Sequence, residues 1–202
     1  MKKITVFTSI IFVIVTGLFL VFVTANGSGE QEKPVVYIAH LNNMVLPVTH
    51  YKLYLRENVH YFENRAGAVI WQTNLGGMTS IEVVKNQALE SFVTVLLTNQ
   101  QTGHPYTGGL TQQELEQAYS QALTFWNDLT PEEQDIFDIE TIRAVNEDII
   151  LHENIRAYMT QNYVEHQQDD RFWSMLDTWR QEAELTINFE VWDAISIEEL
   201  RP

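Results

Sequence analysis

The chain has 202 residues, with 12 basic and 27 acidic side chains, no cysteine and 45% hydrophobic residues. The formal net charge of -15 argues against nucleic-acid binding, because phosphate contacts require clustered Lys and Arg. The lack of cysteine excludes disulfides, cysteine-ligated zinc, thiol catalysis and lipid attachment through a cysteine. The length predicts one domain whose core can fold without cross-links.

A long apolar segment occurs near the N-terminus. Residues Ile4 to Ala25 carry no charge and follow Lys2 and Lys3. As a helix this segment would be roughly 33 Å long, enough to cross a hydrocarbon core of about 30 Å. The preceding lysines favour a cytoplasmic N-terminus. The sequence therefore predicts a single-pass anchor in the cell membrane, with the rest of the chain outside the cytoplasm.

Cleavage near Ala25 is the alternative, because Val23-Thr24-Ala25 is similar to the small-residue site of a secretory signal peptide. The apolar run exceeds the usual signal core of roughly 7–15 residues, which favours the uncleaved anchor. Cleavage would give a secreted protein instead. We expect residues 1–29 to form the anchor or signal segment with a short spacer, and residues 30–202 to form the main domain.

Residues 35–47 are predicted to form a β-hairpin. Val35–Leu41 is rich in β-branched and aromatic residues, which favour a strand. Asn42 and Asn43 suit the positive φ angles of a tight turn, and Met44 to Pro47 would form the returning arm. Because an isolated hairpin is marginally stable, it must pack against the rest of the domain.

The next two segments have the apolar spacing of amphipathic helices. A helix is expected from Thr49 to near Gly67, and a capping box at Thr79 and Glu82 predicts the start of a second helix that ends before Gly103. The apolar stripes are Tyr51, Leu55, Val59 and Phe62 in the first helix, and Val84, Ala88, Phe92, Val95 and Leu96 in the second.

The C-terminal half shows similar helix signals. Two more capping boxes, Thr111–Glu114 and Thr130–Glu133, predict two further helix starts. Asp138 is expected to begin a long helix and Asp169-Asp170 another. Apolar and polar residues alternate over Leu185–Phe189, which is typical of a half-buried strand. The sequence thus predicts a mainly α-helical domain with a small N-terminal β-hairpin and a C-terminal strand.

No residue pattern predicts a catalytic or metal site. The six histidines are scattered, without the convergent ligands that zinc requires. They are His40, His50, His60, His104, His152 and His166. The acidic stretch Glu132–Glu140 lacks the ligand spacing and glycine of a calcium loop, and is interpreted as a solvated helix face. A hydrolytic carboxylate pair stays open, but nothing singles one out. We expect the chain to have no enzymatic activity and to bind no metal or cofactor.

Aromatic residues are the remaining signal. The chain has 5 Trp, 8 Tyr and 10 Phe, more than a small helical core usually needs. Most are expected in the core, but a minority in a groove between helices would suit apolar peptide segments. The candidate binding residues are Tyr54, Trp71, Phe125, Trp126 and Trp173.

The element order and several short motifs resemble the N-terminal chaperone domain of the SurA/PrsA family of extracytoplasmic foldases. The motifs are the hairpin Val35–Pro47, the helix Val84–Val93, the helix start Leu110–Leu115, the helix end Leu151–Asn154 and the closing segment Trp179–Asn188. The family's hairpin usually carries Val-Asn-Gly where this chain has Asn42-Asn43, and its second helix usually has Leu-Ile where this chain has Phe92-Val93. The resemblance implies a helical fold similar to the C-terminal domain of trigger factor.

Two departures from the family matter. Many Gram-positive members are held by a lipidated cysteine, which this chain lacks, so the apolar segment must supply any anchoring. Larger members insert a parvulin prolyl-isomerase domain, and the short stretch between Asn162 and Arg171 leaves no room for one. The parvulin sequence marks are also missing. The resemblance therefore does not imply isomerase activity.

The resemblance implies a membrane-anchored extracytoplasmic chaperone, a holdase or foldase, that binds unfolded or partly folded exported polypeptides. An alternative is a dedicated interaction subunit for one folded membrane or secreted partner, which the aromatic surplus would also suit. A third possibility is a peptidyl-prolyl isomerase whose site is not recognisable from its motifs.

Overall fold

The computed structural model describes residues 36–101 and 105–202. The predicted anchor Ile4–Ala25, the domain boundary at residue 30, Val35 and His104 all lie outside these ranges. Within them, no helix is both long and apolar enough to cross a membrane.

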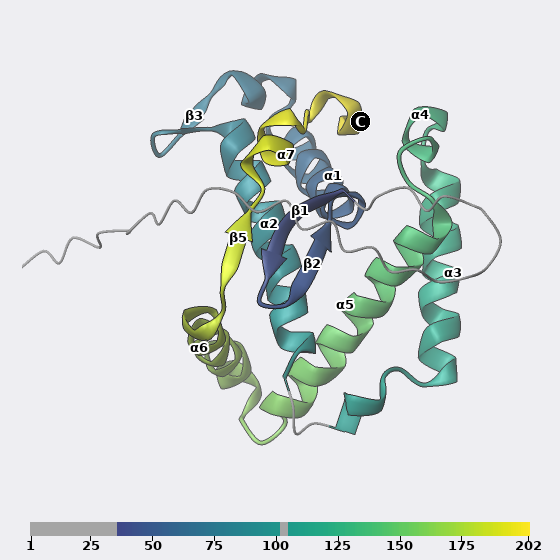
Figure 1. The fold of residues 1–202 in the computed structure, drawn as a ribbon, viewed down its shortest axis with the longest axis vertical. Helices are drawn as coiled ribbons and strands as arrows, with labels where there is room; N and C mark the ends of the chain where they lie inside the picture. Colours follow the sequence, from purple (N-terminus) through teal and green to yellow (C-terminus); the bar gives the residue numbers. More distant parts are fainter. Residues whose placement is uncertain (1–35, 102–104) are drawn as a thin grey trace, which may run out of the picture. The chain divides into compact units, whose positions relative to one another are not determined.

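The described residues form a mainly helical domain with a small antiparallel sheet, as predicted (Figure 1). The α-helices are α1 (Val48–Ala66), α2 (Ser80–Asn99), α3 (Gln112–Asp128), α4 (Pro131–Gln134), α5 (Ile139–Thr160), α6 (Glu165–Glu182) and α7 (Phe189–Ala194). The strands are β1 (Tyr37–Leu41), β2 (Met44–Pro47), β3 (Asn74–Leu75), β4 (Met78–Thr79) and β5 (Leu185–Ile187). Three short 3-10 helices are η1 (Ala68–Gln72), η2 (Pro105–Gly108) and η3 (Glu198–Leu200).

The main sheet joins the two ends of the described chain. Its order is β2-β1-β5, both pairs are antiparallel, and Ala39 pairs with Leu46 on one side and Ile187 on the other. Asn42 has the positive φ expected for the turn, 53°. Its Oδ1 accepts a hydrogen bond from the backbone N–H of Glu184 at 2.9 Å, so the turn also holds the start of the closing strand. The predicted hairpin and C-terminal strand are both confirmed.

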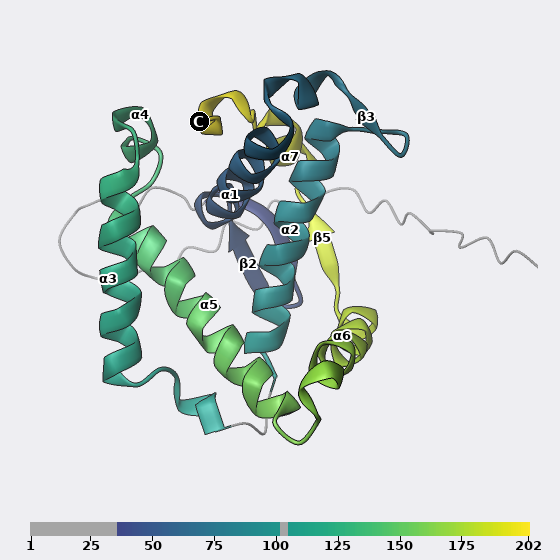
Figure 2. The ribbon, with the colours of Figure 1, turned by 180° about the vertical axis from the view of Figure 1, so that it is seen from behind.

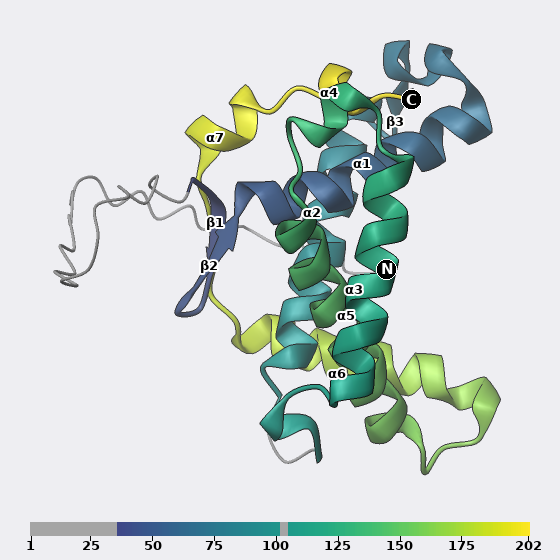
Figure 3. The ribbon, with the colours of Figure 1, turned by 90° about the vertical axis from the view of Figure 1, so that its right-hand side faces the viewer.

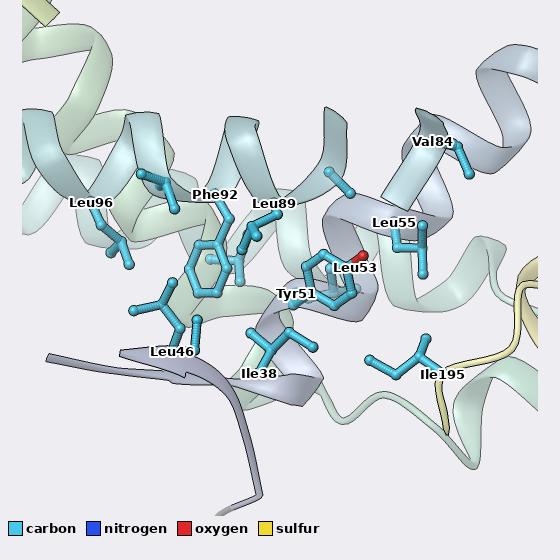
Figure 4. Close-up of a cluster of buried hydrophobic side chains, with 14 of the residues drawn as sticks. Ile38, Leu46, Tyr51, Leu53, Leu55, Val84, Leu89, Phe92, Leu96 and Ile195 are labelled. Carbon is cyan, nitrogen blue, oxygen red and sulfur yellow. The ribbon is translucent and has the colours of Figure 1, made fainter. Parts of the chain in front are cut away.

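The core lies between this sheet, α1 and α2. Figure 4 shows Phe92 and Leu96 of α2 directed toward Ile38 and Leu46 of the hairpin, with Tyr51 of α1 between the two layers. All five side chains are buried, as the apolar spacing predicts for the helical ones. Burying a large apolar side chain contributes about 1.5–3 kcal/mol, so this contact supplies the stability that the hairpin lacks alone.

A second packing layer consists of α3 and α5. Figures 1 and 2 show α3 alongside α5, and α5 lies between α3 and α2; Figure 3 gives the view from the side of α3. The Nδ2 of Asn146 on α5 donates to the carbonyl of Ala118 on α3 at 3.3 Å. The Nδ2 of Asn154 donates to Oε1 of Glu114 at 2.6 Å. These bonds set the position of α3 along α5.

The predicted helix starts depend on side-chain caps. All three capping boxes form, with Thr79, Thr111 and Thr130 as the capping residues. The Oδ1 of Asp138 accepts the backbone N–H of Thr141 at 2.6 Å and caps α5. Each cap satisfies an N–H that has no partner within the helix.

Two predicted boundaries are wrong. The sixth helix begins at Glu165, not at Asp169, and its capping residue Val164 makes no side-chain cap bond. Asp169 instead lies inside the helix, where its Oδ1 accepts from Nη2 of Arg156 at 2.5 Å. Phe189 is not in a strand, because Asn188 accepts the backbone N–H of Val191 and begins α7. Local capping overrides the alternating pattern there.

Candidate binding groove

An apolar groove of about 240 Å³ lies between α1, α3 and α5. Its lining combines eight side chains from the three helices. They are Leu53, Tyr54 and Glu57 of α1, Phe125 of α3, and Ile142, Val145, Asn146 and Ile149 of α5. Such a lining suits the burial of an apolar side chain from a partner.

Helical spacing explains how these residues share one groove. On α5 the lining positions recur at steps of three, one and three from Ile142 to Ile149, which places them on one face. On α1, Leu53 and Glu57 are four residues apart and also share a face. Phe125 is in the last turn of α3, where that helix approaches α1.

Tyr54 connects the groove to the core. Its ring stacks on Phe92 of α2, with 5.1 Å between centroids and 19° between planes. Its hydroxyl is buried and has no hydrogen-bond partner among the described residues. Burial, with a smaller effect from the nearby charge of Asp148, raises the pKa of Tyr54 well above its usual value. Burial thus disfavours the charged form of this hydroxyl.

Arg56 fixes the other aromatic residue of the groove. Its guanidinium carbon lies 4.9 Å from the centroid of the Phe125 ring, a cation–π contact between α1 and α3. Its Nε is 2.5 Å from Oε1 of Glu133, and its Nη1 is 2.9 Å from Oε1 of Glu57. The guanidinium of Arg56 thus contacts the carboxylates of Glu133 and Glu57 and the ring of Phe125.

Glu133 is the exception to the interpretation of the acidic stretch Glu132–Glu140 as a solvated face, since Glu132, Asp135, Asp138 and Glu140 are exposed. Its exposed fraction is only 4%, because it faces Arg56 rather than solvent. Burial opposes ionisation, but the hydrogen bonds from Arg56 and the backbone N–H of Thr130 outweigh it and lower the pKa of Glu133. The residue is an inter-helix partner as well as a cap.

Asp148 lies behind the groove and faces α2. The Nδ2 of Asn99 donates to its carbonyl oxygen at 3.0 Å and to its Oδ1 at 3.3 Å. Burial raises the pKa of Asp148 from 3.8 to about 6, although the bond from Asn99 acts in the opposite direction. The Oδ1 of Asn99 is buried without a hydrogen-bond partner in the described part of the chain.

The structure brings together two of the five candidate residues predicted from the sequence. Tyr54 and Phe125 both line the groove. Trp126 follows Phe125 on α3 but packs against the core, and its carbonyl oxygen accepts from Nε2 of Gln134 at 3.0 Å. Trp126 is therefore adjacent to a groove residue in the sequence, but it does not line the groove.

Trp71 and Trp173 are not part of the groove. Trp71 lies on η1, where its Nε1 donates to Oε2 of Glu63 at 2.8 Å and its ring lies 6.5 Å from Phe62. Trp173 lies on α6 with an exposed fraction of 49%, its ring edge-on to Phe172 at 5.7 Å. Trp71 therefore packs within the domain, and Trp173 is a half-exposed ring that contacts Phe172.

Sequence reasoning missed most of the groove lining. Ile142, Val145 and Ile149 follow an apolar helical stripe in the sequence. The stripe does not show that α3 covers it only partly and leaves these side chains to line a groove. Glu57 has only the pattern of a solvent-facing position. No single-sequence signal reports the pairing of α3 with α5 that creates the groove.

The described residues contain no group of three or more His, Asp or Glu placed to hold a metal ion. His152 is buried with its ring edge-on to Phe172 at 5.6 Å, and burial lowers its pKa. His60 lies 3.9 Å from Glu133, and burial likewise lowers its pKa. His152 therefore packs between α5 and α6, and His60 of α1 lies next to α4.

Comparison of the chain with protein-family models, with curated proteins and with solved structures finds no match. The resemblance to the SurA/PrsA family therefore rests on the sequence motifs alone.

Proposed function

We propose that the chain is a chaperone-like holdase that binds apolar segments of unfolded or partly folded exported polypeptides, without prolyl-isomerase activity. The observation that carries this proposal is the solvent-accessible apolar groove whose walls include the rings of Tyr54 and Phe125. An aromatic-walled slot accepts many apolar side chains, because its contacts depend on area and not on a hydrogen-bond pattern.

The size of the groove favours weak and transient binding. A volume of about 240 Å³ takes a side chain or two, not a folded surface. Burying one large apolar side chain gains about 1.5–3 kcal/mol, whereas each client side chain that becomes ordered costs about 0.5–1.5 kcal/mol. The net charge of -15 keeps such a protein soluble while it holds an apolar client.

We also propose a fold family and a cellular location for the chain, both inferred from the sequence. The domain would be a SurA N-terminal-like, trigger-factor C-terminal-like unit, held at the outer side of the cell membrane through Ile4–Ala25. These features are supported by the sequence motifs and by the apolar N-terminal segment. They would place the groove where exported chains emerge unfolded.

The experiment is an aggregation assay with the full chain in nanodiscs of zwitterionic lipid. A urea-unfolded test protein is diluted into buffer, and light scattering follows its aggregation at stoichiometric ratios. We expect the chain to slow aggregation and Phe125→Ala to lose this effect. Leu123→Ala on the same helix, outside the groove lining, is the matched control. Unchanged aggregation with the original chain would reject the proposal.

A peptidyl-prolyl isomerase function would give a different result. The rate of cis–trans exchange in a proline peptide would rise above background when the chain is added. We expect the background rate, because the sequence lacks the parvulin marks and the insertion that carries them. A rate enhancement that scales with the concentration of the chain would replace the holdase proposal.

One observation favours the second candidate, an interaction subunit for a single folded partner. The strand β2 is at an edge of the sheet, and no strand of the described residues pairs with its outer side. Met44 and Val45 on this strand are exposed. A free apolar edge can add a strand from a partner. A pull-down that yields one stoichiometric protein, rather than many unfolded ones, would favour this candidate.

A further inference from the structure

The charges around the groove are unevenly distributed. Glu57 contributes a carboxylate to the α1 wall. On the α3 side, Phe125 also lines a neighbouring hollow of about 320 Å³, and Asp128 is another of the residues that line this hollow. Asp148 adds a third acidic group behind Tyr54. The apolar slot thus has carboxylates beside it on α1 and α3, and a third acidic side chain on α5 near Tyr54.

The cations near the groove are already paired. Arg56 contacts Phe125, but it bonds both Glu133 and Glu57. Arg143 of α5 pairs with Glu140 and Glu147 and stacks over Tyr119, in a hollow separate from the groove.

Two other basic groups face elsewhere. Lys52 of α1 pairs with Glu199 near the C-terminus. Arg201 bonds Glu63 and Glu198. The carboxylates of Asp128 and Asp148 have no basic partner among the described residues, so the surroundings of the groove carry an excess of negative charge.

We infer that the groove selects segments in which a large apolar side chain is flanked by Lys or Arg. This inference rests on the proposed function and names the class of client for the same site. The apolar side chain enters between Tyr54 and Phe125, and the flanking cation reaches Glu57 or Asp128. An extended chain advances about 3.3 Å per residue, so a cation one or two positions away is within reach. Acidic flanks are repelled by the same carboxylates.

Three fluorescent peptides test this selectivity. They share one apolar centre and differ in flanking residues, which are lysines, serines or glutamates. Fluorescence anisotropy measures their binding to the full chain in zwitterionic nanodiscs, with empty nanodiscs as the baseline. We expect the lysine peptide to bind most tightly and the glutamate peptide least tightly. The difference should shrink as salt is raised, because exposed charges are then screened.

Two double variants localise the effect. Glu57→Gln with Asp128→Asn should lower the ratio of lysine to glutamate affinity about three- to tenfold. Glu190→Gln with Asp170→Asn makes the same charge change at exposed positions on α7 and α6, outside the groove lining, and should preserve the ratio. An equal loss in both double variants would overturn the inference, because the preference would then come from the overall charge.

The remaining outcomes separate the inference from the proposed function. Equal affinity of the three peptides, lost in Phe125→Ala, would overturn the charge selectivity and leave the holdase proposal in place. No binding of any peptide would overturn both.

Discussion

Arg56 on α1 and Glu133 on α4 form a buried ion pair, with 2.5 Å between Nε and Oε1. Glu133 is also the third helical residue of the capping box begun by Thr130. Glu133 therefore links the short helix α4 to α1 and also takes part in capping the N-terminus of α4. Because Arg56 lies over Phe125, the same pair supports one wall of the groove.

Glu133→Gln should destabilise the domain by about 3 kcal/mol, because it leaves the largely buried guanidinium of Arg56 without its main counter-charge. Glutamine still serves in a capping box, so the cap is retained and the lost ion pair is isolated. Urea unfolding of the full chain, followed by circular dichroism, measures the change.

Glu82→Gln is the matched control for this variant. Glu82 occupies the same position in the capping box of Thr79, but it is exposed and has no basic partner in the described residues. We expect a much smaller change in the free energy of unfolding there, because the Glu82 carboxylate is solvated. Equal losses in the two variants would show that capping, not the ion pair, matters at Glu133.

Tyr51 and Tyr54 should respond oppositely to loss of their hydroxyls. The Tyr51 hydroxyl donates to the carbonyl of Lys85 at 3.1 Å, whereas the Tyr54 hydroxyl is buried without a partner among the described residues. Tyr51→Phe should lower the free energy of unfolding by about 1 kcal/mol, because the hydrogen bond to Lys85 is lost. Tyr54→Phe should stabilise the domain by about 1 kcal/mol, since it removes an unsatisfied polar group. Urea unfolding of both variants tests the contrast, and a loss in Tyr54→Phe would contradict it.

The sequence was sufficient for features that depend on a few neighbouring residues. The three capping boxes and the cap at Asp138 form because each cap needs only residues within one turn. The turn at Asn42 follows from the tolerance of Asn for positive φ. Val164 makes no side-chain cap bond at the start of α6, so the residues before Glu165 contain no capping motif from which this start could be predicted.

The groove could not be predicted because it depends on contacts between distant segments. Tyr54 and Phe125 line the same groove because α3 packs along α5 and its last turn approaches α1. The aromatic character of both residues was visible in the sequence, as it was for Trp71. Trp71 lies on η1 outside the groove lining, where it packs against Phe62 and donates to Glu63, and the sequence does not reveal this difference.

Asp148 should make the domain less stable as pH rises. Its pKa is raised by burial to about 6 in the folded chain, above the 3.8 of an exposed Asp. Between these values the folded state holds the proton that the unfolded state has lost, so stability falls as pH rises from about 4 to about 6. Asp148→Asn removes this effect. The variant should be more stable than the original chain by up to about 3 kcal/mol at pH 7.5.

The amide in Asp148→Asn can also donate to the Oδ1 of Asn99, which has no other partner in the described residues. The difference between the variant and the original chain should shrink toward pH 4, where Asp148 is protonated in both states. Urea unfolding over this pH range measures it. A difference that is constant with pH would show that the carboxyl does not titrate as proposed.

Glu63 holds the C-terminal segment against α1. Its carboxylate accepts hydrogen bonds from Nε and Nη2 of Arg201, at 2.9 and 3.0 Å, and from Nε1 of Trp71. The bonds from Arg201 and then Trp71 lower the pKa of Glu63, so their stabilisation is present above its ordinary pKa and is lost as pH falls through the lowered one. Glu63→Gln should therefore loosen η3 at neutral pH.

Hydrogen exchange of residues 195–201 measures this loosening. We expect faster exchange there in Glu63→Gln, together with a change in Trp71 fluorescence, while exchange in α2 stays unchanged. Glu198→Gln is the control, because the Glu198 side chain is exposed and, among the described residues, bonds Nη1 of Arg201 alone, at 3.0 Å. Its effect should be smaller, since exposed pairs contribute little. Equal exchange in both variants would mean that the buried apolar contacts of Leu200, rather than Glu63, hold the segment in place.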